Sequence, residues 1–523
     1  MRNLKKLLAA LPSKKIFGET DFDIKKIEYD SRRINSGDLF VAIPGFKEDG
    51  HEYINSALEG GATGVVAQRD GDYKAKVKVI VPDAREALAL LSCRFFDSPS
   101  KKLKVVGVTG TNGKTTITYQ VKSILEEDKE KVGLIGTIAY FVGKEKLTAT
   151  NTTPESLDLQ NMFYQMQKNG TDSVVMEVSS HALALKRVMG VDFDVAVFTN
   201  LNREHLDFHK TLSAYKKSKG LLFEMLSEDK SCAVINMDDP NWRYFYDKAK
   251  TNRLTYSLHN QKADFYTKSF SITWEGSHID LVTPNGGVKI NLKLLGESNV
   301  YNALASAAVG VALKVNLETI KSGLESVEGI PGRMEKICAG QDFNILIDYA
   351  HTPYALDLLL KTVGRLTPGH LFVLFGCGGD RDQGKRPQMG KVASLLADRI
   401  FLTEDNPRSE DPKNIIDHIL EGVENKEKVE IIIDRKEGIK KALSIAKKGD
   451  SLVLVGKGHE DYQIKKDRKF HFSDKETVLE LLNASAVGSP STSLRTSPPL
   501  AAEKPEDKNV TLRIHRERKP SLC

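Results

Sequence analysis

The sequence predicts an α/β protein with several domains, and three observations support this fold class. The chain has 523 residues. A domain usually has roughly 100–200 residues, so three domains are expected. Short apolar runs typical of buried strands alternate with helical patterns over much of the chain, which predicts largely parallel sheets. One such run, residues 103–108, leads into a glycine-rich turn and a helix, an order typical of phosphate-binding loops.

The first domain is expected at residues 1–98, where short apolar runs are separated by turns. Residues 40–43 and 64–67 are interpreted as strands, and residues 98–102 (SPSKK) as a linker. The start of the chain, MRNLKKLLAALPSKK, is interpreted as a first helix. Its apolar run is too short for a signal peptide, and it contains no small-residue cleavage site.

The second domain is expected at residues 99–330 and the third at residues 331–487, with the boundary at Gly329–Gly332. A helix over 300–313 precedes that boundary, and the predicted strands of the second domain are 103–108, 173–178, 195–199 and 233–236. The third domain repeats the alternation as a smaller doubly wound unit, with predicted strands at 344–348, 371–375, 399–403, 429–433 and 452–455.

Residues 488–523 are predicted to be a disordered tail, since they hold five of the eighteen prolines and almost no apolar periodicity. The whole chain carries a net charge of +6, and seven basic against four acidic residues place half of it in this tail. So small a charge on the remainder argues against a dedicated nucleic-acid binder.

Composition points to an ordinary globular protein, with 40% hydrophobic and 28% charged residues. No run approaches the ~20 apolar residues needed to span a bilayer, so no membrane insertion is expected. The five cysteines are scattered, without a C-x-x-C pair. That pattern is typical of a reduced, cytoplasmic protein without a zinc or disulfide framework.

The glycine-rich turn is the strongest chemical signal in the sequence. Its glycines lie at 107, 110 and 113, followed by Lys114 and two threonines. Backbone N–H groups of such a turn can surround phosphates, Lys114 would reach the terminal phosphates, and the Thr115 hydroxyl could bind Mg²⁺. The alternative interpretation is a glycine-rich turn that binds no ligand. The spacing differs from the commonest phosphate loop, which would have glycine where this chain has Val108.

Other polar residues follow the predicted strands. Glu177 ends one strand, where parallel sheets bind ligands, and His205 and His209 follow the next. Either histidine alone is more often structural, but beside a phosphate loop and Glu177, His205 becomes a candidate metal ligand. By chemistry alone, Lys219, on an amphipathic helical stretch, is interpreted as a surface lysine.

Taken together, the ordered motifs resemble those of the Mur ligase family, and within it the MurE type, the UDP-N-acetylmuramoyl-tripeptide synthetases. The resemblance covers roughly residues 25–485. It rests on DSRRINSGDLFVAIPG (30–45), GTNGKTT (110–116), NTTPES (151–156), MEVSSHALALKRV (176–188), FTNLNREHLDFH (198–209), YKKSK (215–219), GRME (332–335), DYAHTP (348–353), FGCGGDRDQGKRP (375–387), DNPR (405–408) and GKGHEDYQ (456–463).

The resemblance implies a three-domain α/β architecture: an N-terminal UDP-substrate-binding domain, a central P-loop-type ATPase domain with a parallel sheet, and a C-terminal Rossmann-like domain. It implies an ATP-dependent ligase of peptidoglycan precursor synthesis. Such an enzyme phosphorylates the carboxylate of UDP-N-acetylmuramoyl-L-alanyl-D-glutamate, and the amine of meso-2,6-diaminopimelate attacks the acyl phosphate. A cytoplasmic monomer that uses ATP and Mg²⁺ and binds no nucleic acid is expected.

The resemblance also assigns residues to ATP and to the metal. The expected catalytic residues are Lys114, Glu177, His205 and Lys219. The metal ligands would be Thr115, Glu177, His205 and Lys219, the last as a carbamate formed from CO₂. The ATP-binding set is Gly110, Thr111, Asn112, Gly113, Lys114, Thr115, Thr116, Asn302, Arg333, Asp348 and His351. Since the last three come from the third domain, closure of the domains should complete the site.

Two further sets concern the substrates. The UDP-substrate set is Ser31, Asn151, Thr152, Thr153, Ser179 and Arg187. The diaminopimelate set is Arg381, Asp405, Asn406, Pro407, Arg408, Gly456 and Glu460. In the second set, the Arg408 guanidinium could pair with the distal carboxylate that distinguishes diaminopimelate from lysine, and Glu460 suits the distal ammonium. One departure is Leu185, where the family often has Gln, because leucine cannot make the hydrogen bonds of an amide.

Two alternatives remain open at this point. The chain could be another Mur ligase or a folylpolyglutamate synthetase, although the N-terminal DSR motif argues against the folate enzyme and DNPR with GKGHEDYQ argues against the other Mur steps. It could also be a nucleotide-binding scaffold that has lost its chemistry. Loss of Lys114, Glu177, Lys219 or Arg408 would indicate that, and all four are present.

Overall fold

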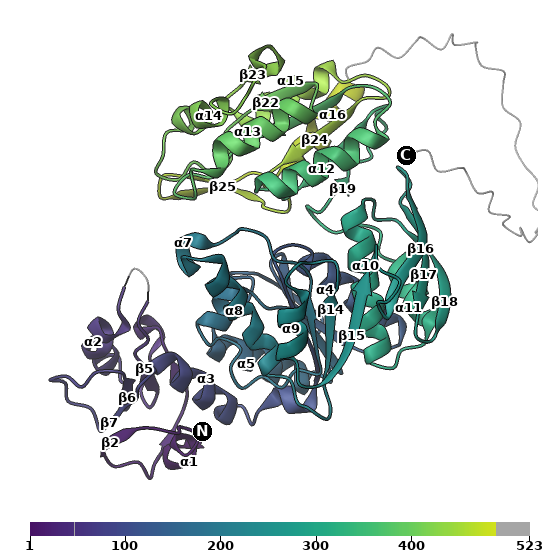
Figure 1. The fold of residues 1–523 in the computed structure, drawn as a ribbon. Coiled ribbons are helices and arrows are strands. Elements are labelled where there is room, and N and C mark those ends of the chain that lie inside the picture. The colour runs from purple at the N-terminus through teal and green to yellow at the C-terminus, as the bar shows by residue number, and fades with distance from the viewer. Residues whose placement is uncertain (46–47, 488–523) are drawn as a thin grey trace, which may run out of the picture. The chain divides into compact units, whose positions relative to one another are not determined.

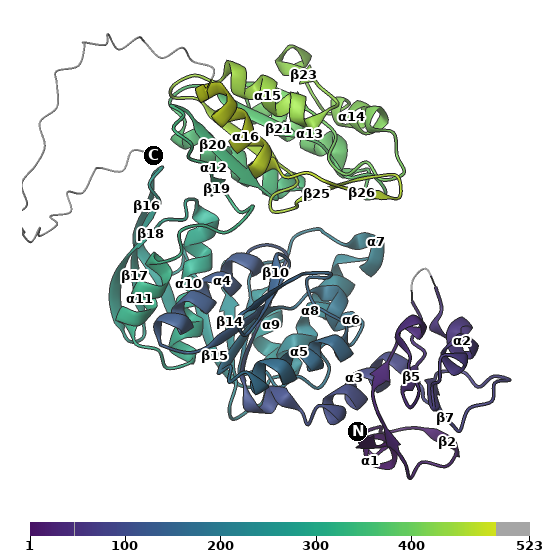
Figure 2. The same ribbon diagram turned by 180° about the vertical axis from the view of Figure 1, so that it is seen from behind.

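The computed structural model describes residues 1–45 and 48–487, and the predicted tail at 488–523 lies outside them. The chain divides into two compact units, one ending at Ile330 and the other beginning at Pro331 (Figures 1 and 2). Within the described residues, no helix is long and apolar enough to cross a membrane.

The first unit begins with a five-stranded sheet in the order β2-β7-β6-β5-β4. Its strands are β2 (Lys15–Gly18), β4 (Ile27–Glu28), β5 (Leu39–Val41), β6 (Gly64–Ala67) and β7 (Val77–Ile80), and all pairs except β2–β7 are parallel. The strands predicted at 40–43 and 64–67 correspond to β5 and β6. A separate pair, β1 (Arg2–Asn3) with β3 (Asp23–Ile24), lies near the start.

Helices α1 (Leu4–Leu8), α2 (Ile54–Glu59) and α3 (Ala84–Phe95) accompany this sheet. The first helix is shorter than predicted and ends before Leu11-Pro12. Helix α3 begins where the Asp83 carboxylate accepts hydrogen bonds from the N–H groups of Arg85 and Glu86, an N-cap that satisfies otherwise unpaired donors. Its apolar face packs Leu88 and Leu91 into a core shared with Leu157 of the following region.

The segment interpreted as a linker, residues 98–102, is in fact a packed turn. It forms the 3-10 helix η3 (Pro99–Lys102), with Pro99 and Ser100 buried. The Ser100 hydroxyl accepts a hydrogen bond from the Asp192 N–H at 3.2 Å, which ties the turn to a loop of the central sheet. Proline at the first position of the turn and this tertiary contact explain why a Ser/Pro-rich stretch is ordered here.

The central sheet has eleven strands in the order β11-β10-β9-β12-β8-β13-β14-β15-β16-β17-β18. Its seven inner strands, from β9 to β16, pair in parallel, and both ends are extended by antiparallel strands. The strands are β8 (Lys104–Thr109), β9 (Val132–Ile135), β10 (Ala139–Val142), β11 (Glu145–Thr148), β12 (Ser173–Glu177), β13 (Val195–Phe198), β14 (Cys232–Asn236), β15 (Asn252–Ser257), β16 (Phe265–Ile272), β17 (Ser277–Thr283) and β18 (Gly286–Leu292).

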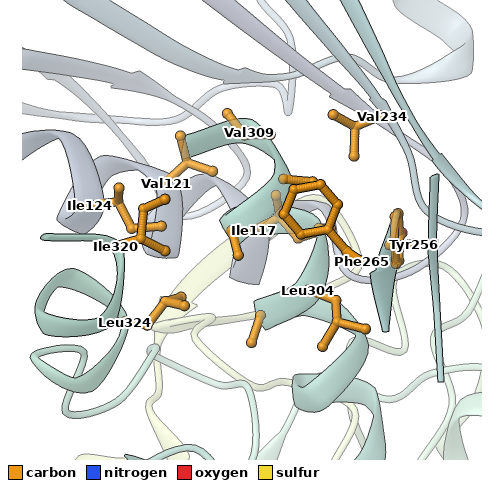
Figure 3. Close-up of a cluster of buried hydrophobic side chains, with 14 of the residues drawn as sticks. Ile117, Val121, Ile124, Val234, Tyr256, Phe265, Leu304, Val309, Ile320 and Leu324 are labelled. Atoms are coloured by element: carbon orange, nitrogen blue, oxygen red, sulfur yellow. The ribbon is translucent and has the colours of Figure 1, made fainter. Parts of the chain in front are cut away.

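Helices cover both faces of this sheet. Successive residues of a strand point to opposite faces, so each apolar strand presents side chains to the helices on both sides. Val106 and Val108 pack with α4 (Lys114–Glu127), α10 (Glu297–Ala312) and α11 (Leu317–Glu325). Figure 3 shows this core, where Ile117, Val121 and Ile124 of α4 face Ile320 and Leu324 of α11. Val105 packs on the other side, in a core with residues of α5 (Ser156–Lys168), α6 (Ser180–Ala184), α8 (Leu212–Glu224) and α9 (Trp242–Lys248).

The predicted inner strands agree with the structure to within one or two residues, and the predicted helix at 300–313 is α10. The antiparallel strands at the two ends were not predicted. Strand β11 is exposed throughout, and β18 has a half-exposed, alternating pattern. These strands lack the continuous apolar runs that mark strands buried on both faces.

The second unit is a smaller doubly wound sheet, as predicted, in the order β19-β20-β24-β21-β22-β23. Only β19 is antiparallel to its neighbour. The strands are β19 (Glu335–Lys336), β20 (Asn344–Asp348), β21 (Leu371–Phe375), β22 (Arg399–Leu402), β23 (Val429–Ile431) and β24 (Ser451–Val455), with a hairpin of β25 (Tyr462–Lys465) and β26 (Arg468–His471).

The helices of the second unit are α12 (Pro353–Leu366), α13 (Lys385–Leu396), α14 (Pro412–Leu420), α15 (Arg435–Ile445) and α16 (Asp474–Val487). Helices α15 and α16 pack on the sheet face that carries Phe372 and Leu374. Helices α12, α13 and α14 form a contiguous layer, seen in front of the sheet in Figure 1. This arrangement brings the carboxyl ends of β20, β21, β22 and β24 to one edge of the sheet.

Candidate active site

The phosphate loop follows β8 and turns into α4 at two glycines with positive φ. Gly110 has φ 146° and Gly113 has φ 88°. A Cβ atom on Gly110 would lie 1.8 Å from Thr199 Oγ1, and one on Gly113 would lie 2.5 Å from Asn302 Oδ1. Conformation and space both require glycine at these positions. The predicted nucleotide residue Asn302, on α10, therefore lies directly against the loop.

The third predicted loop glycine has a different role. Gly107 lies within β8, and a Cβ atom there would come within 2.7 Å of the Phe193 ring. The reading of Gly107 as part of the glycine-rich turn was therefore wrong, and close packing of the strand explains this glycine. The turn itself comprises Gly110, Thr111, Asn112 and Gly113, and Lys114, Thr115 and Thr116 form the first turn of α4.

Two lysines converge on the carbonyl oxygen of Gly110. Lys114 Nζ donates to it at 3.0 Å and to the Thr111 carbonyl at 2.8 Å, while Lys219 Nζ donates to the Gly110 carbonyl at 2.7 Å. Lys219 is fully buried, so its interpretation as a surface lysine was wrong. Burial, and then the positive charge of Lys114, hold the pKa of Lys219 well below the usual lysine value, while Glu204 acts in the opposite direction.

A signal for the burial of Lys219 was present in the sequence. The buried positions of α8 include Tyr215, Lys219, Leu222 and Phe223. They fall at helical spacing, so Lys219 occupies an apolar stripe. Its Nζ lies 4.5 Å from the centre of the Tyr215 ring, which belongs to the preceding turn.

Glu177 ends β12, as predicted, and its carboxylate is held by threonines. It accepts hydrogen bonds from Thr115 Oγ1 at 3.0 Å, from the Thr137 N–H at 2.8 Å and from Thr137 Oγ1 at 3.0 Å. Thr137 Oγ1 also lies 3.1 Å from Thr152 Oγ1. Thr137 was not predicted; its position just after β9, at the carboxyl edge of the parallel sheet, is the signal that could have found it.

The three histidines near Lys219 differ in their surroundings. His209 is buried and its Nε2 lies 3.0 Å from Ser180 Oγ, so it is part of the packing. His205, at the start of α7 (Leu206–His209), has φ 55° and a side chain that is 43% exposed. His181 packs edge-on against His205, with 4.8 Å between ring centres.

All three imidazoles favour the neutral form. Burial lowers the pKa of His181 and of His209 to about 4, and burial also lowers the pKa of His205. A neutral imidazole is the form that binds metal ions. His205 thus has both the exposure and the neutral form expected of a candidate ligand, whereas His209 is neutral but buried.

The predicted metal ligands fit Mg²⁺ in part. Thr115 and Glu177 place a hydroxyl and a carboxylate side by side, which are the oxygen ligands that Mg²⁺ prefers. Over residues 1–45 and 48–487, no group of three or more His, Cys, Asp or Glu residues could hold a metal ion. Mg²⁺ commonly uses only one or two carboxylates together with substrate phosphates and water, so the Thr115–Glu177 pair is compatible with it.

His205 and Lys219 meet at a different place from this pair. Both approach Tyr215, with 6.1 Å between the centres of the His205 and Tyr215 rings. The Tyr215 hydroxyl in turn lies 3.2 Å from Thr111 Oγ1 of the phosphate loop. Lys219 therefore contacts the phosphate loop directly, His205 is linked to it through Tyr215, and Glu177 is linked to it through Thr115.

Most residues predicted to hold the UDP-substrate form one hydrogen-bonded group. Thr153 Oγ1 donates to the Glu177 carbonyl at 2.9 Å and accepts from the Ser179 N–H at 3.1 Å. Arg187 Nη1 donates to the Thr153 carbonyl at 3.1 Å. Thr152 joins through Thr137, and the adjacent Asn151 is exposed.

Ser31 and Leu185 lie outside this group. Ser31 is the first residue of η1 (Ser31–Arg33), the short 3-10 helix capped by Asp30 in the N-terminal sheet region. Within the described residues, its side chain takes part in none of these hydrogen bonds. Leu185, which replaces the glutamine often found in the family, is half-buried and ends α6, with its N–H donating to the His181 carbonyl at 2.8 Å.

Glu155 links this group to the N-terminal sheet region. Its Oε2 lies 3.3 Å from Arg187 Nε and 3.1 Å from Arg85 Nη1, and Arg85 belongs to α3. Tyr29 adds a second link by donating to Asp158 at 2.6 Å. These bonds connect the N-terminal region with the residues of the central sheet that are predicted to bind the UDP-substrate.

In the second unit, the predicted nucleotide residues lie around the end of β20. Asp348 accepts hydrogen bonds from the N–H groups of Met334 and Ala350, both at 2.7 Å, and burial raises the pKa of its carboxyl. Arg333 lies over the Tyr349 ring at 4.6 Å, and His351 Nδ1 lies 2.9 Å from the Tyr349 carbonyl. Asp348 therefore shapes the backbone around Arg333 and His351.

The residues predicted for diaminopimelate gather after β22 and β24. Asn406 Nδ2 donates to Glu460 Oε2 at 2.8 Å, and a Cβ atom on Gly456 would lie 2.7 Å from Asp405 Oδ2. Arg408 has φ 51° and donates through Nη1 to the Gly379 carbonyl at 2.7 Å. Asp405, Asn406 and Pro407 are buried, so they form the wall of this site.

Arg381 lies beside the same site on its exposed side. A Cβ atom on Gly378 would come within 2.9 Å of Arg408 Nη1 and 3.8 Å of Arg381 Cγ, so both arginines flank Gly378. A fully buried lysine, Lys457, lies 3.5 Å from Glu460 Oε2 and was not predicted. Its signal was its place between two glycines of the GKG sequence directly after β24.

Three family models match consecutive parts of this chain. Residues 23–96 match the model "Mur ligase family, catalytic domain", residues 108–310 match "Mur ligase middle domain", and residues 332–458 match "Mur ligase, glutamate ligase domain". The UDP-N-acetylmuramoyl-L-alanyl-D-glutamate--2,6-diaminopimelate ligase of Clostridium botulinum is 44% identical over 470 residues, which cover 89% of this chain and 96% of the relative.

Solved structures agree. A structure of a UDP-N-acetylmuramoyl-L-alanyl-D-glutamate--2,6-diaminopimelate ligase is 32% identical, with a TM-score of 0.67, and the match covers 92% of this chain and 99% of that one. The MurF ligase of Thermotoga maritima in complex with ADP, 22% identical, shares the fold with a TM-score of 0.62, over 88% of this chain and 97% of that one. The chain belongs to the Mur ligase family.

Proposed function

We propose that this protein is an ATP-dependent ligase that joins meso-2,6-diaminopimelate to UDP-N-acetylmuramoyl-L-alanyl-D-glutamate. One observation carries the proposal: Asp405, Asn406, Arg408, Gly456 and Glu460 gather at one sheet edge. The curated relatives that share these regions are named as ligases of that reaction. An arginine fork and a buried carboxylate suit an amino acid that carries both a distal carboxylate and a distal ammonium.

The phosphate loop is the proposed ATP site. The turn between Gly110 and Gly113 frees backbone N–H groups at the start of α4, where the helix dipole also favours phosphate. Lys114 is positioned at the loop and would move from its carbonyl partners to the terminal phosphates. Asn302 lies against Gly113 and is proposed to contact the nucleotide.

Thr115 and Glu177 are the proposed holders of Mg²⁺, and His205, which packs against Tyr215, is a further proposed ligand. When bound, Mg²⁺ neutralises phosphate charge and lowers the barrier to transfer. The residues of this chain do the rest: Thr137 fixes the Glu177 carboxylate, and Thr152, Thr153, Ser179 and Arg187 would hold the substrate carboxylate in line with the γ-phosphate.

The side chain of Lys219 is proposed to carry a carbamate group. Carbamate formation joins the neutral amine to CO₂ and releases one proton, so a lysine whose pKa is lowered by burial is favoured for it. The product is an anion, which can help to bind a cation near the γ-phosphate, whereas an ammonium would repel it. Burial of Lys219 next to Lys114 supports this assignment.

In the reaction, the substrate carboxylate attacks the γ-phosphorus of ATP, and ADP leaves. The neutral amine of diaminopimelate then attacks the acyl carbon, and phosphate leaves while the amine loses its proton. Arg408 and Arg381 are proposed to bind the carboxylates of the amino acid, and Glu460 its distal ammonium. Arg333, Asp348 and His351 are proposed to contact ATP. We also propose a cytoplasmic monomer that binds no nucleic acid.

The test is ligation of a panel of amino acids to the UDP-muramoyl-dipeptide, read by the mass of the UDP-product and by phosphate release. Product is expected with meso-diaminopimelate and not with L-lysine, and phosphate release should require both substrates. Equal use of lysine would contradict the specificity. Phosphate release with folate and glutamate, or without any acceptor, would favour a different enzyme.

A further inference from the structure

Lys457 is a buried cation next to the proposed amino-acid site. It follows β24 directly, and its flanking glycines have φ 108° (Gly456) and φ 53° (Gly458). Its side chain is 0% exposed. Its Nζ donates to the Tyr462 carbonyl and lies 3.5 Å from Glu460 Oε2. The Glu460 N–H donates back to the Lys457 carbonyl at 2.9 Å, so a tight turn brings the two side chains together.

The Glu460 carboxylate is held from two sides at the same oxygen. Asn406 Nδ2 donates to Oε2 at 2.8 Å, and Lys457 Nζ approaches that oxygen from its own turn. Asn406 is itself fixed, since its Oδ1 accepts the Ile464 N–H at 2.9 Å. Contacts from two different loops therefore restrain the position of this carboxylate oxygen.

A cation is needed here because Glu460 lies among groups that oppose its charge. Burial raises the pKa of Glu460, the nearby Asp405 raises it further, and Lys457 and Asn406 act in the opposite direction. The hydroxyls of Tyr349 after β20 and Tyr462 in β25 face the same region. Arg435, at the start of α15, also faces Glu460, but its guanidinium is paired with Asp474 at 2.7 Å and 2.8 Å.

We propose that Lys457 is a positioning residue that keeps the Glu460 carboxylate ionised and oriented for the ammonium group of the incoming amino acid. This inference rests on the proposed function, in which Glu460 binds that ammonium. Lys457 itself, buried behind Glu460, acts through it. Without Lys457, the buried carboxylate of Asp405 and the largely buried carboxylate of Glu460 would share a site with no cation in contact, which favours the protonated form of Glu460.

The direction of the pH dependence follows. Loss of Lys457 removes an interaction that favours the charged form of Glu460, so the pKa of Glu460 rises further. Protonated Glu460 cannot pair with an ammonium, so the defect should be small above that pKa and should grow as the pH falls. A purely structural role for Lys457, through its bond to the Tyr462 carbonyl, would weaken binding by the same factor at every pH.

The experiment compares Lys457→Met with the wild type, since Met keeps the length and apolar stem without the charge. The KM for diaminopimelate is measured from about pH 6.5 to about pH 8.5, and the ratio of variant to wild type cancels titrations that both share. The ratio is expected to rise as the pH falls, by up to about tenfold per pH unit. A ratio that does not change with pH would overturn the proposal.

Two further variants sharpen the result. In a Glu460→Gln background, which cannot titrate at this position, adding Lys457→Met should produce no further pH dependence. Lys457→Arg retains the charge and should give a flat ratio. If Lys457→Met does not fold, Lys457→Arg still decides: a ratio that grows at low pH would contradict the proposal. If the wild type ligates no diaminopimelate at all, the proposed function fails instead.

Discussion

Lys114 and Lys219 donate hydrogen bonds to the same carbonyl oxygen, that of Gly110, at 3.0 Å and 2.7 Å. Two ammonium groups on one acceptor repel each other, and the repulsion falls on the group that is buried. Lys219 is the buried one, so burial first, and then the charge of Lys114, lower the pKa of its amine. This arrangement favours the neutral form of Lys219 beside the phosphate loop.

Replacing Lys219 tests that chemistry. If its carbamate helps to hold the cation, Lys219→Ala should lose nearly all ligase activity, because neither the amine nor the carbamate can form. Added short carboxylates such as formate or acetate should restore part of the rate by filling the space. Lys217→Ala, an exposed lysine on the same helix, is the matched control and should remain active. Undiminished activity of Lys219→Ala without additives would refute the assignment.

Removing the Thr137 hydroxyl tests how Glu177 is positioned. Thr137→Val deletes the Oγ1 bond to the Glu177 carboxylate and leaves the backbone bond in place. Hydrogen bonds to charged groups contribute about 1.5–3 kcal/mol, so the Mg²⁺ concentration for half-maximal activity should rise about tenfold or more. Calorimetric binding of Mg²⁺·ATP should weaken in parallel. Thr137→Ser retains the hydroxyl and should behave as the wild type; equal defects in both variants would point to packing.

Replacing Arg408 tests the amino-acid specificity. Arg408→Ala should lower kcat/KM for diaminopimelate by about 100-fold, because a carboxylate would lose its paired N–H donors. Arg408→Lys keeps a positive charge but lacks the planar fork, so its kcat/KM for diaminopimelate should lie between those of the wild type and Arg408→Ala. Arg399→Ala, an exposed arginine at the start of β22, is the control. The KM for ATP should not change in any of them, and a matching rise in it would show that the variant damages the whole unit.

The buried ion pair of Arg435 and Asp474 gives a prediction about stability. Both side chains are 0% exposed, and Arg435 also donates to the Val455 carbonyl at 3.1 Å and to Thr403 Oγ1 at 3.2 Å. Asp474→Asn leaves the arginine charge uncompensated and should cost about 3–5 kcal/mol in the free energy of unfolding. Glu480→Gln breaks the exposed pair with Lys436 and should cost under about 1 kcal/mol. Urea unfolding followed by circular dichroism would measure both, and similar costs would contradict the argument.

The sequence predicted the parts of the fold that depend on short-range pattern. Continuous apolar runs located β12 and β21 to within a residue, and the glycines of the phosphate loop located the start of α4. Residues that act at strand ends, such as Glu177, could be predicted because parallel sheets bind ligands there. Gly107 was misread because sequence spacing cannot distinguish a loop glycine from one that accommodates the Phe193 ring.

The surroundings of residues that depend on tertiary contacts could not be predicted from local pattern alone, although the family resemblance did single out Lys219. Lys219 reads as a surface residue until α8 is docked on the sheet, and Thr137 is one of many threonines until Glu177 is placed beside it. The role of Lys457 was missed for the same reason. Its contact with Glu460 depends on a turn in which Gly456 and Gly458 both have positive φ. His205 and His209 lie four residues apart at the two ends of one short helix, yet His205 is exposed and His209 is buried.

The core under α3 has a practical consequence for fragments of this protein. Leu157, at the start of α5, is buried in one cluster with Leu88 and Leu91 of α3. A fragment that stops at residue 98 would lack Leu157 and so expose the part of this cluster that Leu157 covers, and it would also lose the partners of Arg85 and Tyr29. Such a piece should aggregate on expression, whereas a piece that ends at Ile330 keeps this apolar surface covered. Ligand-binding studies of the N-terminal sheet therefore need the central sheet attached.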